Sequence, residues 1–325
     1  MQGDTVKPDP TTEGAGRPND GPPGATKGPA SWPSADPHPL GGSSSALVRR
    51  GVDIRHALQA LQAIVMRELF KFSRQTGRLV SALVRPLLWL AVFAAGFRNV
   101  FGIAIVEPYD TYIPYDVYIV PGLVGMVLLF NGMQSSLAMV YDREMGLMRL
   151  LLTAPLPRPW LLFSKLCATA LLSVLQALAF VVVALLIGTD LPLFSLAGLH
   201  ALLALTGSAL MLGALGLLLS VYIKQLENFA GTMNFVTFPM YFISTALYPL
   251  WKLEESGARW VSELAHVNPF THSVEWLRFA LYGQDPGVSP WVVLGTLAAC
   301  FALACWGYDP QRGFGQLAKR PGGAP

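Results

Sequence analysis

The chain has 325 residues, of which 53% are hydrophobic and 13% are charged, and its formal net charge is +3. The charged fraction lies far below the roughly 25% of an average soluble protein. Several uncharged apolar stretches exceed the roughly 18 residues that cross a bilayer as a helix. An ordinary soluble domain is therefore excluded, and an all-α membrane protein with several spans is indicated. The small positive charge gives no reason to expect a nucleic-acid partner, because Lys and Arg in membrane proteins mainly report orientation.

Both ends of the chain are polar. Residues 1–46 are rich in Pro, Gly, Ser, Asp and Thr, and Trp32 is their one aromatic residue. Such a segment buries too little apolar surface to offset its chain entropy, so we predict a disordered tail over 1–46. Residues 309–325 are rich in Gly and Pro and form a second predicted tail.

Residues 47–78 have the pattern of a basic amphipathic helix. The apolar stripe, at steps of three and four, consists of Ile54, Leu58, Leu61, Val65 and Leu69. This pattern suits the headgroup layer of an anionic membrane leaflet, whereas a soluble coiled coil would need more heptads. We therefore predict an N-terminal interfacial helix over 47–78.

Hydropathy predicts six transmembrane helices within residues 79–308. They lie at about 80–101, 117–140, 161–187, 197–222, 229–250 and 288–307. Arg85 stands inside the first of these runs, and we expect its side chain to reach the cytoplasmic interface. Gly207, Gly213 and Gly216 predict close helix packing in the fourth.

The distribution of basic residues predicts the orientation. If both termini are cytoplasmic, the outer loops hold only Arg98, Lys252, Arg259 and Arg278, and most other Lys and Arg residues fall on the inner side. This asymmetry follows the rule that cytoplasmic loops carry the excess of positive charge. The connection between the second and third spans is then cytoplasmic.

That connection, residues 141–165, is the most distinctive stretch of the chain. Asp142 is suited to cap a helix over 143–153 whose first turn holds Glu144, and three prolines follow it. The helix would present Met145, Met148, Leu151 and Leu152 on one face. Two interpretations stay open here: a docking element for another protein, or an ordinary interfacial loop helix.

The loop over 251–287 is long and half apolar. Asn268 and Pro269 have the pattern of a cap and first turn of a helix, and Gly283 is a suitable end. We predict two amphipathic helices that enter the outer interface without crossing the membrane.

The spans offer little chemistry of their own. The interiors of the second to sixth spans contain no Asp, Glu, Lys or Arg, which weighs against transport driven by an ion gradient. The sequence has no P-loop motif, so another chain must bind ATP if ATP drives this protein. Cys167, Cys300 and Cys305 lie in apolar runs and predict neither a disulfide framework nor a zinc site.

The outer loop holds the one cluster with catalytic residue types. His266 and His272 are six residues apart with a proline between them, so they do not share a helix face as a zinc pair does. Glu275 and Arg278 are expected to form a surface pair. We predict no metal site, and the alternative function is a six-span membrane enzyme or scaffold without an ATPase partner.

Uncharged polar residues mark two of the predicted spans. They are Asn131, Gln134 and Ser135 in the second span, and Asn234 and Thr237 ahead of Pro239 in the fifth. Such groups either hold helices together by hydrogen bonds or line a translocation path.

At this point a family resemblance can be stated. The run Asp142-Arg143-Glu144-x-Gly146 through Leu151-Leu152-x-Ala154-Pro155-Leu156-Pro157-Arg158 resembles the loop after span two in membrane subunits of type-2 ABC exporters. Asn268-Pro269-Phe270 before an amphipathic helix is similar as well. The resemblance covers about residues 50–308. It departs from the family at Thr245, where a Ser-Gly pair is common.

The resemblance implies a permease rather than an enzyme. Such a chain binds no cofactor itself and pairs with a separate ATP-binding-cassette ATPase subunit, which holds ATP and Mg²⁺. Two permease chains, expected as a homodimer among membrane lipids, would enclose the path in a bacterial inner membrane. The substrate class implied is amphipathic, lipid-linked or glycan-type.

The resemblance also implies roles for particular residues. A cytoplasmic coupling helix would contact the ATPase through Asp142, Arg143, Glu144, Gly146, Arg149, Leu152, Pro155 and Arg158. The path would be lined by Asn131, Gln134, Ser135, Asn234, Thr237 and Pro239. Re-entrant helices between spans five and six would gate the exit, with Asn268, Pro269, Phe270 and Glu275 among their residues.

Overall fold

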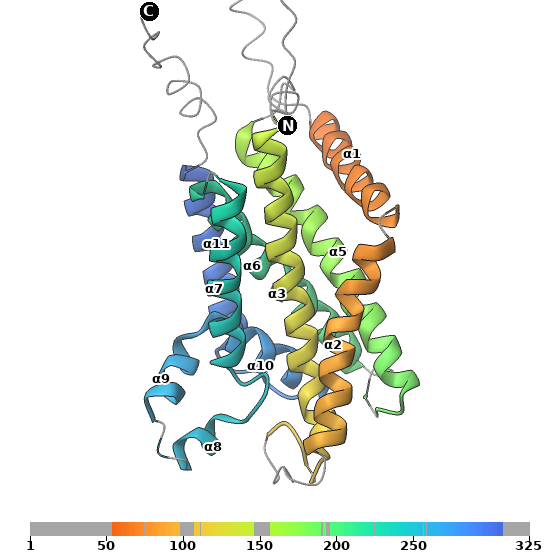
Figure 1. The fold of residues 1–325 in the computed structure, drawn as a ribbon, viewed down its shortest axis with the longest axis vertical. Helices are drawn as coiled ribbons and strands as arrows, with labels where there is room; N and C mark the ends of the chain where they lie inside the picture. The colour runs from red at the N-terminus through yellow and green to blue at the C-terminus, as the bar shows by residue number, and fades with distance from the viewer. Residues whose placement is uncertain are drawn as a thin grey trace, which may run out of the picture. The chain divides into compact units, whose positions relative to one another are not determined.

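The chain folds into a helical bundle over the residues that can be described. The computed structural model describes residues 54–74, 76–97, 107–110, 112–145, 157–189, 191–192, 196–223, 225–255, 257 and 259–307. Every regular element in these ranges is a helix, which confirms the all-α prediction for this part of the chain (Figure 1). The two predicted tails and residues 146–156, at the centre of the predicted coupling helix, lie outside the described residues.

Four of the six predicted spans are confirmed as helices long and apolar enough to cross a membrane. They are α3 (Tyr115–Glu144), α5 (Arg158–Leu186), α6 (Leu196–Tyr222) and α11 (Ser289–Gly307). The first and fifth predicted spans form helices α2 (Thr76–Phe97) and α7 (Leu226–Phe242). Helix α2 has 22 residues and α7 has 17. Among the described side chains of α2, an apolar stretch runs from Leu83 to Phe93.

Helix α7 stops before the predicted end at residue 250. Its last residue is Phe242, and Ile243 leaves the helical conformation. The chain then forms a buried irregular turn over 244–247, in which the Ser244 hydroxyl donates to the carbonyl of Tyr241 at 2.6 Å. A local hydroxyl that bonds the backbone competes with the helical ladder, which accounts for the early end.

Helix α3 is the centre of the bundle and packs against α2, α5, α6, α7 and α10. Its residues from Val117 to Leu129 are all buried. Helices α3 and α6 approach closely at Gly216, where an added Cβ would lie 2.8 Å from the carbonyl oxygen of Gly132. A Cβ at Gly207 would likewise meet the Trp276 ring at 2.6 Å, so the predicted close packing of these α6 glycines is confirmed.

Helix α1 (Ile54–Ser73) packs against α5 and α2, and its buried side chains are Ala57, Ile64 and Phe72. The Trp160 indole N–H, near the start of α5, donates to the carbonyl of Ala57 at 2.9 Å. The predicted apolar stripe is exposed at Ile54 and Leu58 and half-buried at Leu61, Val65 and Leu69. An exposed apolar edge of this kind is what an interfacial helix would offer to lipid.

The predicted outer loop contains three short helices, α8 (Leu250–Glu255), α9 (Arg259–Val267) and α10 (Pro269–Leu281). The Asn268 side chain accepts from the amide of Phe270, which confirms the predicted cap of α10. Gly283 follows with φ of 68°, in the left-handed region suited to a helix end.

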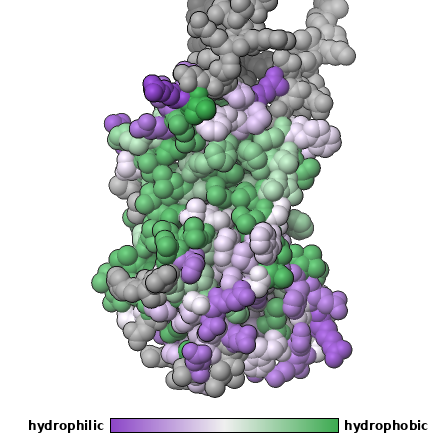
Figure 2. All heavy atoms as spheres, turned by 180° about the vertical axis from the view of Figure 1, so that it is seen from behind, coloured by the Kyte–Doolittle hydropathy of each residue, from purple (hydrophilic) through white to green (hydrophobic). Residues whose placement is uncertain are grey.

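Different helices and helix ends lie at the two ends of the bundle. In Figure 1, α1 and the C-terminal ends of α3 and α11 lie at one end, and α8 and α9 lie at the other. Figure 2 shows apolar residues gathered over the middle of the visible face and hydrophilic residues toward both ends. This arrangement suits a protein that lies across a membrane.

Candidate functional site

The end of α3 that leads into the predicted coupling segment holds a buried ion pair. Lys165 Nζ on α5 lies 3.2 Å from Asp142 Oδ2, with side-chain exposures of 10% and 11%. The predicted capping role of Asp142 is wrong, because α3 continues to Glu144 and places Asp142 in its last turn. Asp142 therefore fixes α3 to α5 instead of beginning a new helix.

The next two charged residues fix the same end of α3 to other helices. Arg143 Nη2 donates to the carbonyl of Ser220, near the end of α6, at 2.8 Å. Glu144 Oε1 accepts from the amide of Leu226, the first residue of α7, at 2.8 Å. A carboxylate at this place satisfies an otherwise unpaired amide and interacts favourably with the positive end of α7.

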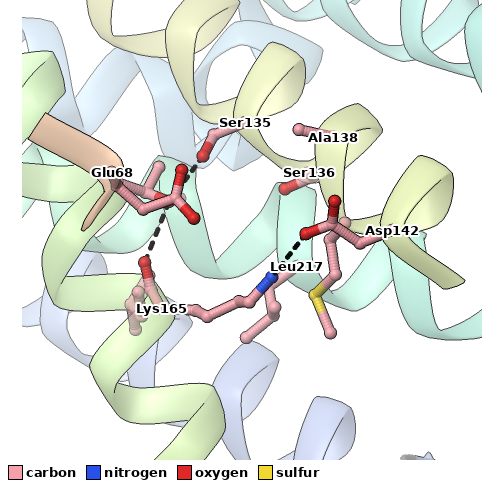
Figure 3. A pocket seen from close by; sticks show the side chains of 11 residues that line it. Glu68, Ser135, Ser136, Ala138, Asp142, Lys165 and Leu217 are labelled. Atoms are coloured by element: carbon pink, nitrogen blue, oxygen red, sulfur yellow. Dashed lines mark hydrogen bonds and ion pairs between the residues drawn. The ribbon is translucent and has the colours of Figure 1, made fainter. Parts of the chain in front are cut away.

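Figure 3 shows a pocket around this ion pair. Glu68 from α1 faces into it, together with Ser135 and Ser136 of α3 and Leu217 of α6. Helices α1 and α3, which are far apart in sequence, thus place polar groups beside the Asp142–Lys165 pair. We call this pocket the Asp142 pocket.

A line of hydrogen bonds continues from the ion pair along the α3–α5 contact. Ser135 and Thr169 share a hydroxyl–hydroxyl bond of 2.7 Å, and the Asn131 amide donates to the Ser173 hydroxyl at 2.8 Å. These residues and the Asp142–Lys165 pair form what we call the polar seam. Asn131 and Ser135 were predicted to pack helices or to line a path, and their bonds support the packing interpretation.

The other predicted path residues do not gather at one place. Gln134 is exposed on α3. On α7, Asn234 and Pro239 are exposed, whereas Thr237 is fully buried and its hydroxyl has no partner among the described residues. The three α7 residues therefore do not share one face.

Of the predicted ATPase contacts, only those at the edges of the connection can be placed. Asp142, Arg143 and Glu144 make the contacts above, and Arg158 is the exposed first residue of α5. Gly146, Arg149, Leu152 and Pro155 lie outside the described residues.

At the opposite end of the bundle, Arg278 of α10 is buried, although its sequence context predicted a surface position. Its predicted surface pair with Glu275 is wrong, because Arg278 is only 4% exposed. Its guanidinium lies 4.2 Å from the centre of the Tyr118 ring and donates to the carbonyl of Thr245 at 2.9 Å. The burial of Arg278 could have been predicted from its spacing, because residue 278 follows Val274 by four positions and lies on the same buried face of α10.

Asn268 ties α10 to the end of α7. Its amide nitrogen donates to the carbonyls of Met240 at 2.7 Å and Ile243 at 2.6 Å. Tyr115 donates from α3 to the carbonyl of Leu247 at 2.6 Å. The turn after α7 is therefore fixed from α10 and α3 together, and the predicted gate residues Asn268, Pro269 and Phe270 lie beside it.

The outer histidines have structural partners. His272 Nε2 lies 2.9 Å from the carbonyl oxygen of His266, and His266 Nδ1 lies 2.8 Å from that of Ser262. In the described part of the chain, no group of three or more His, Cys, Asp or Glu side chains is arranged to hold a metal ion.

Four helices long and apolar enough to cross a membrane, with a polar seam between two of them, define a polytopic membrane protein. Residues 59–282 match the family model described as ABC-2 type transporter. Because this match covers more than half of the chain, the chain belongs to the ABC-2 type transporter family.

The relatives have names of the same kind. The chain is 29% identical over 233 residues to the transport permease ycf38 of Porphyra purpurea, covering 70% of this chain and 76% of that protein. It is 29% identical over 245 residues to ycf38 of Cyanophora paradoxa, covering 74% and 78%. The inner membrane transport permease YadH of Escherichia coli K12 is 24% identical over 259 residues, covering 79% of this chain and 96% of YadH.

Proposed function

We propose that this chain is the permease subunit of an ATP-driven exporter, and that a separate ATP-binding-cassette subunit binds and hydrolyses the ATP with Mg²⁺. The family assignment supports this proposal. The observation that carries it is the end of α3, where three successive charged residues contact three different helices.

This geometry would distribute a displacement that arrives through residues 146–156. Asp142 passes it to α5, Arg143 to α6 and Glu144 to α7. Hydrogen bonds to charged groups contribute roughly 1.5–3 kcal/mol each, so the cluster resists separation when the segment is pushed. The ATPase closes when it binds ATP. This closed form would favour one of the two permease conformations, open to the inside or open to the outside, and so shift the equilibrium between them.

The proposal includes a homodimer in a bacterial inner membrane, with both termini cytoplasmic. The outward face of α7 exposes Asn234, Phe235 and Phe238, which suits a contact with a second chain around a shared path. The turn after α7, fixed by Asn268 and Arg278, would form the exit gate. An amphipathic, lipid-linked or glycan-type cargo is proposed for this path.

Affinity purification of the tagged chain from its native membranes tests the partnership. We expect an ATP-binding-cassette subunit to co-purify with the wild type and to be lost from the Arg149→Glu/Arg158→Glu double variant. The matched control is Arg259→Glu, which reverses an exposed charge on α9 and should leave co-purification unchanged. Equal recovery with the double variant, or no ATPase with the wild type, would overturn the proposal.

A further inference from the structure

A second pocket lies between α2, α3, α5 and α7, away from the Asp142 pocket. Its lining combines one cation, three amide side chains and apolar groups. The residues that matter are Arg85, Phe130, Gln134, Gln176, Met126 and Met233, and we call it the Arg85 pocket.

Arg85 is exposed, and its guanidinium lies 4.3 Å from the centre of the Phe130 ring. Phe130 is midway along α3, and the reach of Arg85 to the cytoplasmic interface stays a prediction. No described acidic side chain forms an ion pair with Arg85. A basic residue at the centre of a membrane helix costs roughly 2.5–3.5 kcal/mol on insertion scales, and such residues usually have a function.

Gln176 of α5 gives a second, independent sign of a ligand. It is 3% exposed, and neither its amide nitrogen nor its amide oxygen has a partner among the described residues. Leaving a buried polar group unpaired costs roughly 1–3 kcal/mol. Because Gln176 lines the same pocket as Arg85, one bound polar group could satisfy both.

We propose that the Arg85 pocket binds the anionic head group of an amphiphilic substrate, a phosphate or carboxylate that carries an apolar chain. Guanidinium groups bind both anions through paired charge-assisted bonds, and the Gln176 amide supplies a further donor. The methionine side chains Met126 and Met233 offer an adaptable surface for the apolar chain. This inference rests on the proposed function, since it names the cargo class of that exporter.

The pocket is also connected to the polar seam. Asn131 lines the Arg85 pocket and donates to Ser173, one helical turn from Gln176 on α5. A head group that draws on these amides therefore acts on the α3–α5 contact that ends at the Asp142–Lys165 pair. Bound substrate would in this way favour one arrangement of the helices next to the ATPase.

The test measures binding of radiolabelled dodecyl phosphate to the full chain in phosphatidylcholine nanodiscs, with empty nanodiscs subtracted. We expect saturable binding that unlabelled dodecyl phosphate displaces and that neither dodecanol nor inorganic phosphate displaces at the same concentration. Arg85→Gln should weaken binding by about tenfold, and Arg85→Lys should retain part of it. Arg259→Gln, the matched control on α9, should bind as the wild type does.

Several outcomes would overturn the inference. They are absence of saturable binding, equal displacement by dodecanol or by inorganic phosphate, and wild-type binding by Arg85→Gln. The competition arms use the wild type alone, so they decide the question even if Arg85→Gln does not fold. Gln176→Leu adds a variant without a charge change, and it should weaken binding severalfold.

The same preparations separate this inference from the proposed function. If no ATPase co-purifies with the wild type while dodecyl phosphate binding is intact, the exporter assignment is contradicted and the head-group site is supported. A co-purifying ATPase without dodecyl phosphate binding would overturn the cargo class alone.

Discussion

Removing Lys165 should destabilise the protein strongly, and removing its partner as well should restore most of the loss. The Asp142–Lys165 distance is 3.2 Å and both side chains are about nine-tenths buried. Breaking a buried pair from one side typically costs about 3–5 kcal/mol, because the remaining charge stays buried without compensation. Replacing both members by apolar residues is often neutral.

The assay is a double-mutant cycle on the purified protein, with the unfolding free energy, or the apparent melting temperature, as the readout. Lys165→Met should be much less stable than the wild type, and Asp142→Leu/Lys165→Met should recover most of the difference. The control is Lys252→Met, which removes an ion pair at 3.5 Å whose side chains are 47% and 62% exposed. It should cost roughly 0–1 kcal/mol. Additive losses in the cycle would refute the coupling of Asp142 with Lys165.

Three further predictions concern stability and share the same readout. Gly122→Ala should cost roughly 1–3 kcal/mol by overpacking against the backbone of Ala246, whereas Gly231→Ala, with no atom within 4 Å, should be neutral or stabilising; equal effects would contradict the packing account. Asn268→Ala should cost more than the roughly 0.5–2 kcal/mol of a lost cap, because two carbonyls of α7 also lose a donor, so a smaller loss would contradict these contacts. Arg278→Met should cost roughly 1–3 kcal/mol through the lost bond to Thr245, and an unchanged melting temperature would show that this bond contributes nothing.

Local patterns predicted the helices well because apolar periodicity and caps act over a few residues. Asn268 and Pro269 begin α10 as predicted, since capping needs only the next two residues. The helix over 143–153 was placed by the same logic, but Asp142 belongs to α3 because Lys165, 23 residues later, provides a partner that spacing cannot reveal. The charge of Arg278 led to the wrong prediction that it lies on the surface. Its buried position depends on the Tyr118 ring and the Thr245 carbonyl, which come from other elements.

The pockets could not be predicted because they form between helices distant in sequence. Glu68 reaches the Asp142 pocket from α1, and Arg85 of α2 and Gln176 of α5 line one pocket. Asn131 was predicted as a functional residue from its polarity alone, and its partner Ser173 becomes evident only once α3 lies beside α5. The ATPase contacts of residues 146–156 stay a prediction.

The bonds at the two ends of α7 make this helix a rod with both ends attached. Glu144 accepts the amide of its first residue, and Asn268 binds its last carbonyls. With 17 residues at ~1.5 Å per residue, the rod is ~26 Å long. A shift of Glu144 by a few ångströms, at the end proposed to bind the ATPase, would be carried along the axis to the turn at the other end of α7. Helix α7 itself would not need to bend or unwind.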